Sequence, residues 1–144
     1  MKLKLLPLVL ISSFVLAAPS DSQTMTDKHG VCAYSVPRNW KKSGTFAVQP
    51  DGHARASAIS GAYTPADITI ATAGFKKQTL EQDAHHVLYR ITITGELAAF
   101  ATLEYYEAIF QGGQGCIVRS NTDLKNPAPL EQSLRQIASS ARFK

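Results

Sequence analysis

The chain has 144 residues, with 15 basic and 11 acidic side chains, a formal charge of +4 and two cysteines. This length fits one domain whose apolar core needs no metal. Lys2 and Lys4 fall in a predicted export signal, so 13 basic and 11 acidic residues remain without it. No run of five like charges occurs, and pairs such as Lys41-Lys42 are typical of solvated strand edges, so the composition argues against a nucleic-acid-binding protein.

Residues 1–17 have the pattern of a secretory signal peptide. Two lysines precede an apolar stretch at residues 5–16, which ends in small residues at the cleavage positions. We expect cleavage after Ala17, because cleavage after Ala18 would place Pro19 next to the cut. The apolar stretch is shorter than the roughly 20 residues of a membrane-spanning helix, and no cysteine follows it that could carry a lipid. The sequence thus predicts a periplasmic or, alternatively, a secreted protein with no membrane span or lipid anchor.

Cys32 and Cys116 are the two cysteines of the chain. An even number of cysteines in an oxidising compartment predicts a disulfide. The bridge would close a loop of 85 residues, counted inclusively, and the chain-entropy model gives about 4–5 kcal/mol for such a loop. The alternative is a redox pair, which the absence of a Cys-x-x-Cys spacing disfavours.

The N-terminal half predicts short strands after a polar leader. Residues 18–28 lack periodicity and are expected to be a flexible leader, so the ordered domain would span residues 29–144. A strand over residues 31–36 should end at Pro37, which cannot donate to a ladder, in a turn that directs Trp40 to the core. An exposed connection and two further strands are then expected at residues 41–44, 45–49 and 54–60.

The middle of the chain predicts an antiparallel meander. The segment 67–73 fits either a strand or a short helix opened by Pro65, and residues 79–84 suggest a brief helix capped by Thr79. Apolar residues alternate with polar ones over residues 87–94, as in a half-buried strand. The remaining predicted elements are a turn at 95–96, a long strand at 98–110, a hairpin tip at 111–115 and a strand at 116–119.

The C-terminal segment predicts a helix. Asn126 is the expected cap, and Pro127 or Pro129 falls in the first turn, where a missing N–H costs little. The apolar residues at helical spacing are Leu130, Leu134, Ile137, Ala138 and Ala141. Glu131 and Arg135 would pair on the outer face. The predicted fold class is therefore α+β: an antiparallel, largely meandering sheet with a C-terminal helix packed on one face.

Three segments resemble the PsbP-like α/β fold family. They are Tyr-Ser-Val-Pro-Arg-Asn-Trp at residues 34–40, Ile-Thr-Ile-Thr-Gly-Glu-Leu-Ala-Ala-Phe at 91–100, and Gln-Ile-Ala-Ser-Ser-Ala-Arg-Phe at 136–143. The family includes photosystem PsbP proteins, bacterial DcrB-type lipoproteins and proteins associated with type VI secretion. The resemblance implies a PsbP-like fold and a binding or accessory role. The chain departs from the family in lacking a lipid-attachment cysteine and in having a cysteine pair.

No pattern of catalytic or metal-binding residues is found. His85 and His86 would lie on opposite faces of a strand, so their rings do not converge on one metal. Glu104 and Glu107, three residues apart on a strand, would likewise not form an acid and base pair. No Gly-x-Ser-x-Gly occurs, and residues 112–115 lack the Lys and Ser or Thr of a phosphate loop. We therefore expect no enzyme activity, no cofactor and no metal.

One short loop is a candidate for binding a partner. Residues 60–63, Ser-Gly-Ala-Tyr, resemble the Ser-Gly-x-Tyr loop of bacterial periplasmic lysozyme inhibitors, which enters the cleft of the target enzyme. The predicted partner-binding residues are Ser60, Gly61 and Tyr63. A strand end followed by a glycine turn is the alternative interpretation.

These observations favour a non-catalytic periplasmic binding protein with a protein partner. The hypothesis is an immunity or inhibitor protein that neutralises a toxin or hydrolase acting on the cell envelope, such as a type VI secretion effector, by binding over its active site. The alternative is a PsbP-like or DcrB-like accessory protein that supports an assembly or a small ligand. An enzyme is the third possibility.

Overall fold

The computed structural model describes residues 21–144, so the predicted signal peptide at residues 1–17 lies outside the described residues. The strands are β1 (Ser22–Thr26), β2 (Cys32–Pro37), β3 (Lys41–Ser43), β4 (Phe46–Val48), β5 (Ala54–Gly61), β6 (Lys76–Gln82), β7 (His86–Thr92), β8 (Leu103–Gln111), β9 (Gln114–Thr122) and β10 (Arg142–Phe143). The helices are α1 (Pro65–Thr72) and α2 (Glu131–Ser139), with short 3₁₀ turns η1 (Gly95–Ala99) and η2 (Ala128–Leu130).

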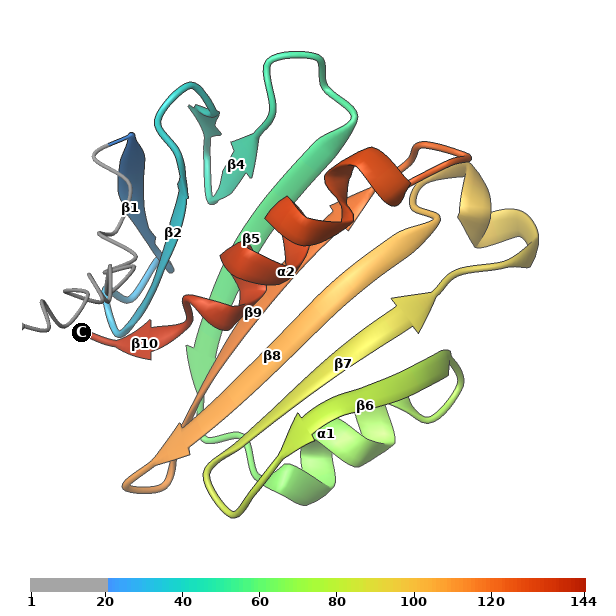
Figure 1. Cartoon of the computed structure of the whole chain (residues 1–144). Coiled ribbons are helices and arrows are strands. Elements are labelled where there is room, and N and C mark those ends of the chain that lie inside the picture. The colour runs from blue at the N-terminus through green and yellow to red at the C-terminus, as the bar shows by residue number, and fades with distance from the viewer. Residues whose placement is uncertain (1–20) are drawn as a thin grey trace, which may run out of the picture.

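The strands form two antiparallel sheets. A seven-stranded sheet has the order β3-β4-β5-β9-β8-β7-β6, and a three-stranded sheet has the order β1-β2-β10. Helix α2 runs across one face of the larger sheet beside the small sheet, and α1 lies on the opposite side near β6 (Figure 1). The predicted class is confirmed: an α+β protein with a largely meandering antiparallel sheet and a C-terminal helix on one face.

The small sheet packs on β5 because β5 presents small side chains to it. Ala54, Ala56 and Ala58 alternate along β5 and are buried, which leaves room for Tyr34 of β2. The Tyr34 hydroxyl donates to the Ala56 carbonyl at 3.2 Å, and burial raises the pKa of Tyr34 to about 12. Trp40 is also buried in this core, as the predicted turn at residues 37–40 requires.

Helix α2 is held on the sheet by apolar and polar contacts. Leu134, Ile137 and Ala138 are buried on its inner face. At its first turn, the Glu131 carboxylate accepts hydrogen bonds from Arg90 and, at 2.8 Å, from the Tyr105 hydroxyl. The hydrogen bond from Arg90 and that from Tyr105 lower the pKa of Glu131. Glu131 therefore faces the sheet, in place of the outward pair with residue 135 that the sequence suggested.

A disulfide joins the two sheets. Cys32 of β2 and Cys116 of β9 are bonded, with their Cα atoms 5.2 Å apart, and both are fully buried. The predicted disulfide is thus confirmed. Because the two residues are 84 positions apart in the chain, the bond restricts most of the unfolded domain.

Reduction of this disulfide should strongly destabilise the protein. The chain-entropy model predicts a loss of about 4–5 kcal/mol in the free energy of unfolding, which urea denaturation with and without reductant would measure. The double variant Cys32→Ser/Cys116→Ser should be as unstable as the reduced protein and insensitive to reductant. Equal urea midpoints for oxidised and reduced protein would contradict the prediction.

The prediction that residues 18–28 form a flexible leader is wrong for residues 21–28, the part that the structure describes. Residues 22–26 form β1, which pairs with β2, so the ordered domain begins before residue 29. The reason is the buried carboxylate of Asp27, which accepts from the N–H groups of Val31 and Cys32 at 2.9 Å each and so closes the hairpin. Gly30, at φ 68°, supplies the left-handed residue of that turn.

Three other local predictions are also corrected. Residues 79–84 are not a capped helix but belong largely to edge strand β6, because pairing with β7 satisfies the backbone and Leu80 alone offers little apolar helix face. Residues 41–43 are strand β3, not a connection. The long strand expected at 98–110 begins only at Leu103, after the 3₁₀ turn η1. The ambiguous segment 67–73 lies mainly in α1.

Candidate functional site

The second face of the large sheet is only partly covered within residues 21–144. Helix α1 places Ile68 on a cluster of buried side chains from β7, β8 and β9, namely Val87, Tyr89, Ile91, Tyr106, Ala108 and Ile117. Side chains of the same face on β4 and β5 stay exposed, among them Phe46 at 43% and Ile59 at 47%. A face that is apolar but half covered is the most distinctive surface of the described chain.

A hollow of about 640 Å³ lies where α1 meets the uncovered part of the sheet. Its apolar lining consists of Ile59, Ile68, Ala71, Phe75, Ile91 and Ile117, and its polar lining of Tyr63, Asp67, Thr72, Glu104, Tyr106 and Arg119. The floor is buried, whereas Ile59 and Phe75 stand exposed at the rim. This volume suits one or two large side chains or a small molecule.

Helix α1 begins at a capping box, which fixes the wall of the hollow. The Thr64 hydroxyl oxygen accepts from the Asp67 backbone N–H at 3.2 Å, and the Asp67 carboxylate accepts from the Thr64 backbone N–H at 2.8 Å. Pro65 occupies the first turn, where its missing N–H costs nothing. The backbone N–H and then the hydroxyl of Thr64 lower the pKa of Asp67.

An ion pair crosses the floor of the hollow. Arg119 Nε lies 3.0 Å from Glu104 Oε1, Arg119 Nη2 lies 3.2 Å from Glu104 Oε2, and Asn121 donates to the same carboxylate at 3.2 Å. The Glu104 side chain is 5% exposed and that of Arg119 is 50% exposed. The guanidinium also lies over the Tyr106 ring, 5.9 Å from its centroid. Glu104 is thus neutralised, while one edge of Arg119 faces solvent.

The residues of the predicted binding loop, 60–63, lie on different sides of the large sheet. The Ser60 hydroxyl donates to the Asp27 carboxylate, away from the hollow, and Gly61 pairs with Gly115 at the end of β5. Tyr63 lines the hollow and also a second one of about 370 Å³ beside the β8–β9 turn. Of the three residues predicted to bind a partner, Tyr63 is therefore the one placed at the site, and a binding role for any of them stays a prediction.

The buried Asp27 carboxylate fixes the base of this loop. Burial pushes the pKa of Asp27 upward, but hydrogen bonds from Ser60 and from the backbone of Cys32 and Val31 outweigh it and lower the pKa. The ionised carboxylate thus links the β1–β2 hairpin to the end of β5. Ser60 has a structural contact that the loop resemblance did not indicate.

Gly115 is required because Tyr63 crosses directly over it. A Cβ at this position would lie 2.8 Å from the Tyr63 Cβ and 3.2 Å from its carbonyl oxygen. Such distances force the loop or the strand to move.

Gly115→Ala should therefore destabilise the protein by about 1–3 kcal/mol, as small-to-large changes in packed regions do, and should displace Tyr63. Thermal denaturation and NMR shifts of the loop would measure this. Gly74→Ala is the matched control, since a Cβ there meets nothing within 4 Å. The expectation fails if the two variants melt alike.

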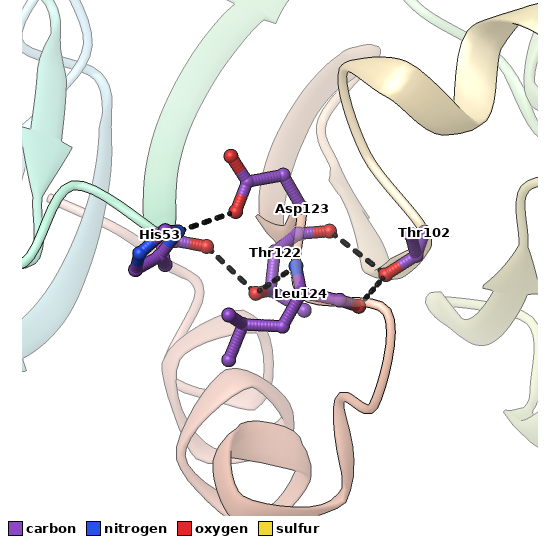
Figure 2. A network of polar contacts seen from close by, with 5 residues as sticks. All are labelled: His53, Thr102, Thr122, Asp123 and Leu124. Carbon is purple, nitrogen blue, oxygen red and sulfur yellow. Dashed lines mark hydrogen bonds and ion pairs between the residues drawn. The ribbon is translucent and has the colours of Figure 1, made fainter.

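His53 takes part in a polar network at the end of β5 and β9, shown in Figure 2. Its Nδ1 lies 2.9 Å from an oxygen of Asp123, and its carbonyl accepts from the Thr122 hydroxyl at 2.6 Å. The Thr102 hydroxyl donates to the Leu124 carbonyl. The hydroxyl of Thr122 thus meets the backbone of His53 and not its ring, and the network ties strand ends together.

The other histidines of the described chain belong to no larger cluster of carboxylates, although His86 pairs with one. His86 Nδ1 lies 2.9 Å from Asp83 in the β6–β7 turn, and His85 lines the second hollow. Among residues 21–144, no three His, Cys, Asp or Glu side chains are grouped as metal ligands. No helix in this range has the length and apolarity to span a membrane.

Structure comparison relates the chain to PsbP. The cyanobacterial PsbP protein CyanoP from Synechocystis sp. PCC 6803 superimposes with a TM-score of 0.51 and 12% sequence identity, covering 86% of this chain and 93% of CyanoP. The fold is therefore PsbP-like, as the sequence resemblance implied. No protein-family model matches the sequence, and the search of curated proteins gave no significant match.

Glu107 lies on the opposite face from the hollow, where its strand partners are the buried Leu88 and Val118. It is buried, its Oε2 has no hydrogen-bond partner in the described chain, and burial raises its pKa from 4.5 to about 7. The unfolded chain thus releases this proton at a lower pH than the folded one. The free energy of unfolding should consequently fall as pH rises from about 4.5 to 7.

Glu107→Gln has a neutral side chain at every pH, so its free energy of unfolding should not show this fall with rising pH. Above pH 7 the variant should be more stable than the wild type by up to about 3 kcal/mol. Urea denaturation from pH 4.5 to 8 would measure the effect. Parallel pH profiles for the variant and the wild type would contradict it.

Apart from Tyr63, the sequence interpretation did not identify the residues that make the hollow. Ile59 comes from β5, Arg119 from β9 and Phe75 from the turn before β6, and they have no common motif. One signal was present: Arg55, Ser57 and Ile59 form the outer side of β5, and a large apolar residue there is unusual on a solvated face.

Proposed function

We propose that the protein is a non-catalytic binding protein of the cell envelope that inhibits a toxin or hydrolase by covering its active site. The observation that carries the proposal is the hollow with Ile59, Phe75 and Tyr63 at its rim. Tyrosine, phenylalanine and arginine are favoured at the centres of protein interfaces, where they fill or form pockets. A partner side chain that enters the hollow would bury these exposed apolar groups.

The rigid support of the site favours the same function. The disulfide, the bonded Asp27 carboxylate and the capped start of α1 hold the elements around Tyr63 in place. A surface that is already ordered loses little entropy when it binds, which is an advantage for an inhibitor that must compete with substrate. Export, expected from the first 17 residues, would bring the protein to targets that act on the envelope.

The direct test is inhibition of a candidate target. The purified protein would be mixed with the product of an adjacent toxin or hydrolase gene, and complex formation, enzyme activity and survival of cells that express the toxin would be measured. Tight binding with loss of enzyme activity supports the proposal. No complex together with no protection of cells would overturn it.

A second candidate is an accessory protein that supports an envelope assembly or a small ligand. The PsbP-like fold and the size of the hollow favour it. This role would leave enzyme activity unchanged in the test above, and a deletion strain would show an assembly defect in the absence of any toxin.

Tyr63→Ala should weaken binding of the partner at least tenfold, about 1.4 kcal/mol, because the ring lies at the rim of the hollow. Affinity would be measured by calorimetry and folding by thermal denaturation. Phe100→Ala is the control, since this ring is 76% exposed and lies outside the hollow. Unchanged affinity in Tyr63→Ala would remove Tyr63 from the interface.

A further inference from the structure

The cross-strand register shows how the uncovered face extends beyond the hollow. Paired residues of neighbouring antiparallel strands have their side chains on the same face. Phe46 pairs with Ser57, Ser57 with Arg119, and Arg119 with Tyr106 at the floor of the hollow. Phe46 is therefore about 10 Å from Arg119, two strand spacings away on the same surface. The uncovered face thus continues from the hollow across β9 and β5 to β4, through the polar side chains of Arg119 and Ser57 to the exposed ring of Phe46.

The next row of the same face is basic. Lys41 pairs with Val48, Val48 with Arg55, and Arg55 with Asn121. Both Lys41 and Arg55 are exposed. They place two cations in the row beside Phe46, and Arg119, although paired with Glu104, keeps one half-exposed edge toward the same surface.

This face has little negative charge to oppose those cations. On this face, strands β3, β4, β5 and β9 carry Lys41, Arg55 and Arg119 and no acidic residue, while their fourth basic residue, Lys42, lies on the opposite face. Glu104 on the floor is paired with Arg119 and accepts a hydrogen bond from Asn121, so Asp67, exposed at the cap of α1, is the remaining acidic group in the lining of the hollow. At the end of the strands, Asp123 lies against His53. The charges available to a partner on β3, β4, β5 and β9 are therefore positive.

From this arrangement we propose that the uncovered face of β4, β5 and β9, with Lys41 at its edge, binds an acidic protein segment that carries a large apolar side chain. The apolar side chain enters the hollow beside Ile59, and flanking carboxylates pair with Arg55, Lys41 and the outer edge of Arg119. Charge complementarity selects this occupant, since a basic or neutral segment would leave the cations unpaired. The inference rests on the proposed function and specifies the chemistry of the partner.

Two synthetic peptides test the inference without the native partner. The first has a central phenylalanine flanked by two aspartates and two glutamates, and the second replaces the four acids by asparagine and glutamine. Each is titrated into the ¹⁵N-labelled protein purified after export, and the chemical-shift changes give the binding surface and Kd. The acidic peptide should shift residues of β4, β5 and β9 and bind at least about tenfold tighter than its amide analogue, increasingly so at low salt.

Two matched double charge-reversal variants test whether the acidic peptide binds to this face. Lys41→Glu/Arg55→Glu should weaken the acidic peptide at least about tenfold. Lys42→Glu/Lys76→Glu makes the same change in net charge on residues whose strand partners are Ala47 and Thr92, on the opposite face, and should keep the wild-type Kd. Thermal denaturation of both variants checks that the fold is intact.

Three results would overturn the inference: no binding of the acidic peptide at millimolar concentration, equal binding of the amide analogue, or equal effects of the two double variants. The outcome is separable from that of the proposed function. Inhibition of a hydrolase that is insensitive to salt and to Lys41→Glu/Arg55→Glu would keep the function and reject the acidic partner. Binding of the acidic peptide at this face without inhibition of any hydrolase would keep the acidic partner and reject the inhibitor function.

Discussion

The unequal covering of the large sheet governs the rest of the structure. Both faces of β7, β8 and β9 carry apolar side chains, and each must be removed from water. Helix α2 and the small sheet bury one face completely around Tyr34, Leu88 and Val118. Helix α1 is only eight residues long and reaches the β7–β8 part of the other face. The exposed remainder is where the candidate site lies.

The rigidity of the covered side supports the open side. The Cys32–Cys116 bond fixes β2 to β9, and the carboxylate of Asp27 links the same hairpin to Ser60 at the end of β5. Tyr63 follows three residues later and packs over Gly115, the neighbour of Cys116. The site is therefore attached to the most constrained part of the domain, which preserves its shape before a partner binds.

Two glutamates of β8 show how the faces differ. Glu104 points into the hollow, where Arg119 and Asn121 satisfy its carboxylate. Glu107, three residues further along, lies on the opposite face beside Leu88 and Val118 and has an oxygen with no partner in the described chain, and burial raises its pKa to about 7. The same side chain is thus a paired anion on one face and a destabilising acid on the other, because the surroundings decide the cost of its charge.

The sequence by itself determined the fold class, the disulfide, the turn from Pro37 to Trp40 and the amphipathic helix α2, because these depend on period, residue type and an even number of cysteines. Only the tertiary structure decided that β1 and β6 form as strands and where the hollow lies. Residues 22–26 and 76–82 have weak local patterns and become strands only because β2 and β7 provide hydrogen-bonding partners. The hollow joins Ile59, Phe75 and Arg119, which are far apart in the chain, and only the register of the strands brings them to one face. Of the predicted loop, the fold left Tyr63 at this surface and gave Ser60 a structural bond.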